Sequence, residues 1–176
     1  GLAAQLDVQA IYDLVGDKLR EIFGGQATFI ALYDEASRTI SFPYYVGDQG
    51  ERIAAQPLEL GQGLSSIVIT SRRSLVLGKY EDAVAYGAVF QDDDRMESWM
   101  GAPILIGDTV IGLIAVQDYP ANRYAESDVR LLSTLASSMA VALENARLFG
   151  ETNRLLDETR QRAAELEIIS SVGRAL

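Results

Sequence analysis

In the first part of this chain, the pattern of apolar and polar positions changes from that of a helix to that of strands. Near the N-terminus, apolar residues recur every three or four positions, which predicts a helix that ends at Gly24-Gly25. We expect its packed side to carry Leu6, Ala10, Ile11, Leu14, Leu19 and Ile22. Two runs rich in β-forming residues follow at 27–34 and 39–46, with a polar turn between them. These runs predict two antiparallel strands.

The middle of the chain predicts a third strand, a short helix and an edge strand. Residues 53–58 favour the third strand, because Pro57 stands near its end, where the missing N–H is tolerated. A short helix over 64–70 opens at Gly61-Gln62-Gly63, and residues 75–77 are typical of a brief edge strand.

Residues 78–98 show no clear period, and we expect a long irregular connection there. Such connections are often functional in compact domains. The next two runs, 102–106 and 110–116, predict a hairpin that is apolar at nearly every position. A strand that is apolar on both sides is covered on both sides.

The helical period returns at Ser127 and continues to the end of the chain. Steps of four and three, the heptad spacing of a helical seam, connect Leu131, Leu135, Ser138, Ala142, Asn145, Phe149, Thr152, Leu156, Thr159, Ala163, Leu166 and Ser170. Residues 147–162 are charged apart from a narrow stripe, so this stretch needs a partner helix. The simplest partner is a second copy, and we expect a parallel homodimer through the first and last helices. Its interface is expected to include Leu131, Leu135, Ala142, Phe149 and Leu156. We divide the chain into a domain at 1–150 and a coiled-coil linker at 151–176.

Composition narrows the classes of function. The chain has 176 residues, 48% of them hydrophobic, which suits one domain with an extension. The formal net charge of −10 disfavours a nucleic-acid partner. Apolar runs stay far below the roughly 18 residues of a membrane span, so we expect no membrane contact and a cytoplasmic location. The absence of Cys and His excludes a disulfide, a thiolate nucleophile, a Ser-His-Asp triad and a Cys or His metal site.

Four aromatic residues, Tyr80, Tyr86, Phe90 and Trp99, lie in or beside the irregular connection. Aromatic walls suit a planar or partly apolar ligand. The alternative is that they fill the space themselves as a small additional core, because pockets and cores draw on the same residue types.

Polar candidates have two interpretations each. Ser65 and Ser66 follow Gly63 at a helix start, where free N–H groups hold anions, although such a serine more often caps its own helix. Gln117 ends a buried strand and points an amide either into a pocket or to a strand-end hydrogen bond. In the pair Tyr44-Tyr45, alternation places one ring in the core and the other outside it or in a pocket.

An acidic cluster, Asp92-Asp93-Asp94 with Glu97, contains the hard ligands that divalent cations prefer. It lacks the spacing of a calcium loop, so we favour a solvated acidic loop and predict no metal site.

The order of these elements resembles the GAF domain family. The resemblance is carried by residues 61–68 (GQGLSSIV), by the hairpin at 99–104 and 107–116, and by the closing helix at 128–149; it covers roughly residues 8–149. It implies an α+β fold, GAF/PAS-like, with an antiparallel sheet of five to six strands. The first and last helices are expected to pack on one face of this sheet, and short helices and loops are expected to roof a ligand pocket on the other. It also implies sensing and dimerisation, with output relayed along the last helix to an effector such as a histidine kinase. Residues 165–176 resemble the first helix of another such domain.

Departures from known subclasses of the family restrict the ligand. Bilin-carrying members attach the chromophore through Cys and support it with His, so a covalent bilin is excluded, and the cofactor is otherwise unknown. Members that reduce methionine sulfoxide depend on Cys, and we expect this chain not to be an enzyme. Members that bind cyclic nucleotides often carry an Asn-Lys pair, which is matched here by Gln117-Asp118; this change weakens that interpretation. The two functions that remain are a ligand-sensing dimeric module and a structural spacer whose pocket is filled by its own side chains.

Overall fold

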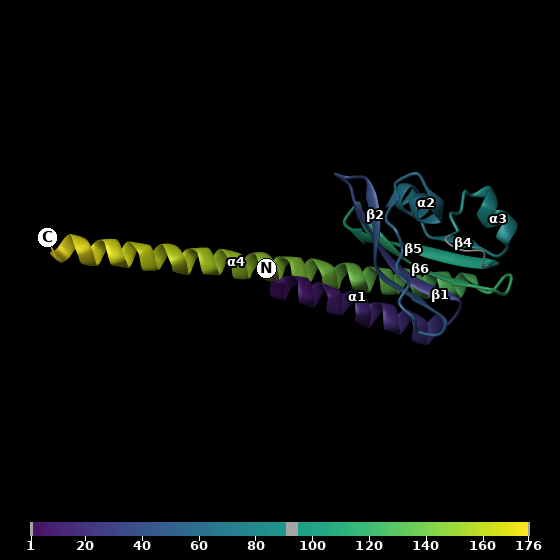
Figure 1. The fold of residues 1–176 in the computed structure, drawn as a ribbon, viewed down its shortest axis with the longest axis horizontal. Helices are drawn as coiled ribbons and strands as arrows, with labels where there is room; N and C mark the ends of the chain where they lie inside the picture. Colours follow the sequence, from purple (N-terminus) through teal and green to yellow (C-terminus); the bar gives the residue numbers. More distant parts are fainter. Residues whose placement is uncertain (1, 91–94, 176) are drawn as a thin grey trace.

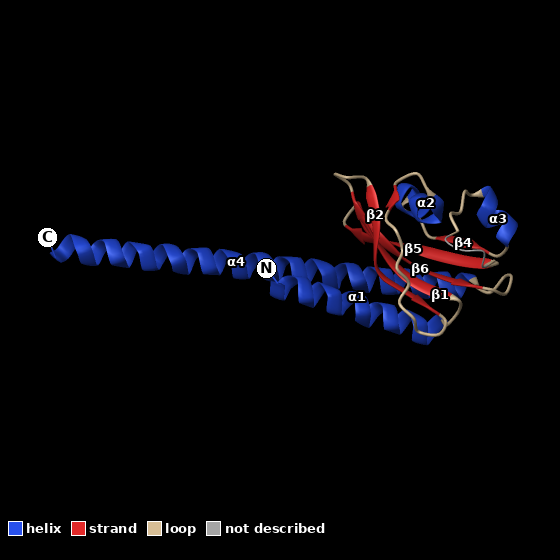
Figure 2. Cartoon of the chain, viewed as in Figure 1, coloured by secondary structure: helices blue, strands red, loops and turns tan. Residues whose placement is uncertain are grey.

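The computed structural model describes residues 2–90 and 95–175, and it shows a six-stranded antiparallel sheet between two layers of helices (Figures 1 and 2). The strand order is β3-β2-β1-β6-β5-β4. The predicted α+β class with a long C-terminal helix is confirmed. The elements are α1 (Leu2–Phe23), β1 (Ala27–Asp34), β2 (Thr39–Gly47), β3 (Leu58–Glu59), α2 (Gly63–Ser71), β4 (Leu75–Leu77), α3 (Tyr80–Ala85), β5 (Ser98–Ile106), β6 (Thr109–Asp118) and α4 (Glu126–Ala175).

The central strands are buried on both faces, as their nearly continuous apolar sequence predicts. On β1, Ile30 packs in the core beneath the sheet, whereas its neighbours Phe29 and Ala31 pack in a second core above it. On β5 the same alternation places Met100 beneath the sheet and Trp99 above it. Each central strand therefore touches both layers of the molecule.

Helices α1 and α4 cover one face of the sheet. Leu132, Ala136, Met139 and Leu143 of α4 are buried against β5 and α1. The buried side of α1 differs from the predicted one. It is formed by Tyr12, Leu19 and Phe23, with Val8, Ile11 and Val15 partly buried beside them.

The predicted side of α1 was wrong in part: Ile11 and Leu19 pack in the core as expected, whereas the other described positions do not. Leu14 is 74% exposed and Ile22 is 38% exposed, and Ala10 is exposed as well. The actual face is built around the aromatic ring of Tyr12, which a count of aliphatic residues passes over. The side chain of Leu6 lies outside the described side chains.

Tyr44 on β2 fits against α1 at Gly16. A Cβ atom at Gly16 would lie 2.3 Å from Cζ of the Tyr44 ring, so only glycine leaves room for the ring. The Tyr44 hydroxyl donates a hydrogen bond of 2.8 Å to Asp17, and the Arg52 guanidinium lies 4.6 Å from the ring centroid. Burial, and then the Asp17 carboxylate, raise the pKa of Tyr44 to about 12. The prediction that one ring of the Tyr44-Tyr45 pair lies in the core is confirmed.

The opposite face of the sheet is covered by α2, α3 and the loops around them. Leu64, Val68 and Ile69 of α2 pack on Ala115 of β6 and its neighbours, and Ala83 of α3 joins the same core. Helices contribute fewer buried residues to this second core than to the first. The cavity described below lies on this face of the sheet.

The predicted third strand at 53–58 was wrong in extent. Only Leu58 and Glu59 pair with β2, and Arg52 forms a single isolated bridge to Val46. Pro57 has no N–H to donate to a ladder, so the chain leaves the edge of the sheet between these two points. In the predicted irregular connection the structure places a helix, α3, which is too short to show a helical period in the sequence.

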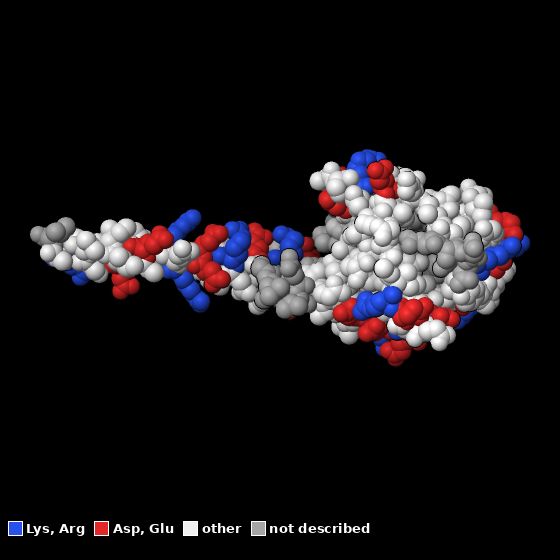
Figure 3. All heavy atoms as spheres, in the orientation of Figure 1, with Lys and Arg blue, Asp and Glu red and all other residues white. Residues whose placement is uncertain are grey.

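Helix α4 continues as a single rod well past the sheet and past the N-terminal end of α1 (Figure 1). Every described residue from 151 onward is exposed, including Leu156, Leu166 and Ile169. Acidic and basic side chains alternate along this rod (Figure 3). Among the helices of the described ranges, none is both long enough and apolar enough to cross a membrane.

Candidate ligand cavity

A cavity of about 180 Å³ lies between the outer face of the sheet and the start of α2. Strands β1, β2, β5 and β6 supply its floor, and α2 with the segments before and after it supplies its walls. We call this space the cavity. Its lining combines an aromatic wall, the first turn of α2, a pair of glutamines and two carboxylates.

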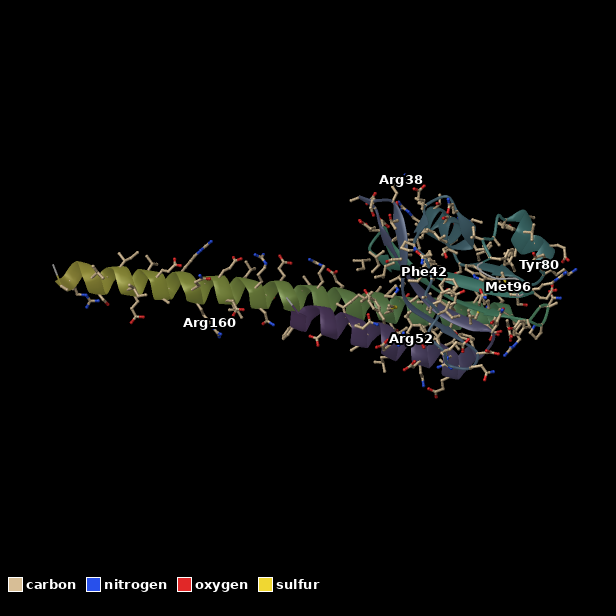
Figure 4. The ribbon with its side chains drawn as sticks, viewed as in Figure 1. Arg38, Phe42, Arg52, Tyr80, Met96 and Arg160 are labelled. Atoms are coloured by element: carbon tan, nitrogen blue, oxygen red, sulfur yellow. The ribbon has the colours of Figure 1, made fainter. Side chains whose placement is uncertain are left out.

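The aromatic wall is organised around Phe29 on β1. Its ring centroid lies 5.6 Å from Phe42, 5.2 Å from Tyr45 and 6.5 Å from Trp99. Phe29 and Trp99 are almost fully buried, whereas Phe42 and Tyr45 are partly exposed toward the cavity. Met96 also lines the cavity. Figure 4 shows Phe42 and Met96 in the region of the sheet. Contacts of the Phe29 ring with its three aromatic neighbours therefore hold this wall together.

Trp99 holds its place in this wall because the residue two positions along β5 is glycine. The indole lies over Gly101, where a Cβ atom would come within 2.3 Å of Cη2. Gly101 pairs with Ala115 of β6, so a second small residue adjoins the ring. A larger side chain at Gly101 would push the indole away from the sheet.

The first turn of α2 faces the cavity through Gly63, Leu64 and Ser65. Gly63 has a φ of +71°, a left-handed conformation that favours glycine. The N-cap residue Gln62 makes no side-chain capping hydrogen bond, which leaves first-turn N–H groups open to an acceptor. The Ser65 side chain is buried, and its hydroxyl has no hydrogen-bond partner within residues 2–90 and 95–175.

Ser65 therefore does not cap its own helix. Ser66 instead bonds back to the preceding loop: its hydroxyl donates to the carbonyl of Gln62 at 2.6 Å and accepts from the N–H of Gly61 at 2.9 Å. Ser66 stabilises the turn into α2, whereas Ser65 offers its hydroxyl to the cavity.

The polar part of the lining lies at strand ends. Gln117 on β6 donates its amide to the side-chain oxygen of Gln26 at 3.5 Å, and both residues line the cavity. Asp48 and Glu51, after β2, are exposed and contribute two carboxylates to the lining. Neither carboxylate forms an ion pair with any residue that the structure describes.

Four of the six residues predicted as ligand-binding line the cavity: Phe90, Trp99, Ser65 and Gln117. Tyr80 and Tyr86 do not. Tyr80 (labelled in Figure 4) stacks on Phe90 with ring centroids 5.0 Å apart, and Cζ of Arg95 lies over the Tyr80 ring, 4.6 Å from its centroid. Tyr86 ends α3 and is 51% exposed. A direct contact between any of these residues and a ligand stays a prediction.

The sequence reasoning missed Phe29, Phe42, Asp48 and Glu51, and assigned Tyr45 only in part. The signal for the aromatic residues was present. Alternation along β1 and β2 places Phe29 and Tyr45 on one face, and the two residues pair directly across the strands. The two acidic residues carried no signal, because a turn after a strand is polar in most proteins.

Glu97 anchors the start of α3 rather than a cation. Its carboxylate accepts from the backbone N–H of Tyr80 at 3.0 Å and from Nε of Arg95 at 2.8 Å. The Tyr80 hydrogen bond, followed by Arg95, holds the pKa of Glu97 below its usual value. Asp92, Asp93 and Asp94, the other members of the predicted acidic loop, lie outside the described residues.

The chain belongs to the GAF domain family, whose family model matches residues 5–144. Solved structures with the same fold include a free methionine-R-sulfoxide reductase from Neisseria meningitidis, with a TM-score of 0.70, 18% identity, and coverage of 81% of this chain and 80% of that one. The GAF domain of an Acinetobacter phosphoenolpyruvate-protein phosphotransferase matches with a TM-score of 0.68, 18% identity, and coverage of 82% and 92%. Residues 122 to 287 of a methyl-accepting chemotaxis protein match with a TM-score of 0.68, 22% identity, and coverage of 81% and 92%. GAF domains with this fold thus occur in signalling proteins.

The expectation that the chain is not an enzyme, which was based on the absence of Cys, was wrong. The reductase from Neisseria meningitidis was solved in complex with its substrate, and further free methionine-R-sulfoxide reductases share the fold. The GAF fold therefore accommodates catalysis as well as regulation.

Proposed function

We propose that this chain is the small-ligand-sensing and dimerising module of a cytoplasmic signalling protein, such as a sensor kinase, and that α4 relays its state to an effector domain. One observation carries the proposal: the cavity and the helices α1 and α4 lie on opposite faces of the same sheet. A ligand on one face can thereby act on a helix that leaves the domain from the other.

The connection between the two faces runs through β5. Trp99 lines the cavity, and the next residue, Met100, is fully buried beneath the sheet in the core with α4. A close-packed core transmits a displacement of one side chain to its neighbours. A shift of the indole on ligand binding is therefore expected to change how α4 sits on the sheet, which is the kind of helix shift that signalling proteins use.

Dimerisation is supported by the exposed apolar side chains of α4. Leu131 is 42% exposed, Phe149 64% and Leu156 49%, while Leu135 and Ala142 are partly exposed. Phe149 and Leu156 also line a surface groove of about 610 Å³ beside the start of α1. A second copy in parallel orientation would cover this stripe along the whole length of α4, in the manner of a coiled coil.

The alternative function is a structural spacer with a self-filled pocket. It is favoured by Trp99, which is nearly fully buried, and by the stacked pair of Tyr80 and Phe90. The sensor is favoured by the space that these rings leave and by the Ser65 hydroxyl, which faces this space without a partner. Tyr86 is exposed, whereas a pocket filled by all four aromatic residues would have it packed.

Native mass spectrometry of the purified protein separates the two functions. We compare wild type with Ala88→Phe, which fills the cavity, and with Ala85→Phe, which adds the same ring on the exposed side of α3 outside it. The sensor predicts a bound small molecule in wild type and in Ala85→Phe, and its loss in Ala88→Phe. Absence of any adduct from all three proteins would favour the spacer.

A further inference from the structure

We infer that the cavity takes a compact organic cation, an amine or a quaternary ammonium compound with a small apolar body. This inference rests on the proposed sensing function and deepens it by naming the class of ligand. Three properties of the lining carry it: its charge, its aromatic wall and its size.

The charge of the lining is entirely negative among the described residues. Asp48 and Glu51 line the cavity, and no Lys or Arg of residues 2–90 and 95–175 does so. Arg20 lies beside Gly50 of the same segment but forms no ion pair with Asp48 or Glu51. Two other guanidinium groups are paired elsewhere. Arg52 binds Asp13 at 2.7 Å, and Arg95 binds Glu81 at 2.7 Å. An anionic ligand would meet two carboxylates without a counterion, whereas a cation would supply the missing partner.

The aromatic wall favours the same sign of charge. An aromatic face is negative, and an ammonium group within about 6 Å of a ring centroid is attracted to it. Phe42 and Tyr45, whose ring centroids lie 6.0 Å apart, line the same cavity as the two carboxylates and are partly exposed. Several rings around one cation form the aromatic cage that recognises quaternary ammonium ligands.

The volume limits the ligand to a small molecule. A cavity of about 180 Å³ is close to the roughly 150 Å³ of an apolar cavity that holds benzene. It is too small for a nucleotide in this conformation. The start of α2 sets the orientation, because a helix N-terminus is positive and repels a cation. The cationic group is therefore directed to Asp48 and Glu51, and a hydrogen-bonding group at the other end of the molecule meets Ser65.

Isothermal titration calorimetry with three probes of nearly equal shape tests the inference. Choline is a quaternary ammonium alcohol, 3,3-dimethylbutan-1-ol is its neutral carbon analogue, and 3,3-dimethylbutanoate is an anion of similar size. We expect choline to bind at least about tenfold more tightly than the neutral alcohol, and the anion to bind most weakly.

Matched variants assign the preference to the two carboxylates. The double variant Asp48→Asn, Glu51→Gln is expected to lose most of the preference for choline while still binding the neutral alcohol. The control Asp108→Asn, Glu35→Gln removes the same charge from two turns outside the cavity and is expected to keep the preference. Because both double variants have the same net charge, the comparison excludes a general effect of the acidic surface.

Equal or tighter binding of the neutral alcohol or the anion would overturn the inference and leave the sensing function standing. Failure of all three probes to bind, after a co-purified adduct has been removed from the protein, would overturn it in the same way. Failure of the sensing function itself has a different signature, namely no adduct in wild type by native mass spectrometry.

Discussion

The contact between Gly16 and Tyr44 makes a sharp prediction for the substitution Gly16→Ala. A new Cβ atom would lie 2.3 to 2.5 Å from three carbons of the Tyr44 ring, whereas carbon atoms pack at about 3.5–4.0 Å. The ring or the helix must therefore move by more than about 1 Å. The ring has little freedom, since it is fully buried and its hydroxyl is bound to Asp17.

The expected cost is the difference between two opposing effects. Overpacking of a core costs about 1–3 kcal/mol, and loss of the hydrogen bond to Asp17 adds about 1.5 kcal/mol. Alanine in place of glycine inside a helix returns about 1 kcal/mol. The net result is a loss of about 2 kcal/mol, which lowers Tm by roughly 4–8 °C for a chain of this length.

Urea unfolding followed by the fluorescence of Trp99, the single tryptophan, measures this loss. The control is Gly173→Ala in α4, where a Cβ atom meets nothing within 4 Å; only helix propensity acts there, so the midpoint is expected not to fall. In a Tyr44→Leu background the cost of Gly16→Ala is expected to disappear, because the rigid ring is gone. An equal cost in both backgrounds would refute the contact as its cause.

Three further outcomes test other parts of the structure. Gly101→Ala is expected to displace the Trp99 indole and shift its emission to longer wavelength, whereas unchanged emission would mean that the ring does not lie over Gly101. The folded pKa of Glu97 is lowered, so its anchoring of α3 is complete above about pH 4.5 and is lost as pH falls through the lower folded pKa. Hydrogen exchange of the Tyr80 amide, corrected for intrinsic rates, should show this loss. The variant Glu97→Gln should remove the pH dependence of that exchange. Phe149→Asp or Leu156→Asp is expected to shift the protein toward monomer in light scattering, and an unchanged mass would contradict the dimer.

The sheet and its covers could be predicted largely from the sequence, because burial on both faces leaves a direct trace in composition. The hairpin of β5 and β6 is apolar at nearly every position, and the structure buries it on both sides. β1 was predicted with its observed bounds for the same reason. Short elements escaped prediction, since the six residues of α3 do not complete two helical turns.

The cavity could be predicted only in part, because its lining comes from segments far apart in the chain. Trp99 and Phe90 were found because they lie in or beside a segment without periodicity. Phe29 was missed because a phenylalanine inside a strand is typical of ordinary core. Only the register of β1 with β2, which the sequence does not determine, brings Phe29 beside Tyr45.

The central claim is that α4 leaves the sensing domain to pair in parallel with a second copy and moves when the cavity fills. A single Cys at Arg160, an exposed position of α4 (Figure 4), accepts a nitroxide uniquely because the chain has no other cysteine. Double electron–electron resonance should then give one distance between subunits of roughly 10–30 Å, since paired helices lie about 8–10 Å apart, and this distance should change on saturation with choline. Absence of any dipolar interaction between labels would contradict the pairing, and a distance that stays constant with choline bound would contradict the relay.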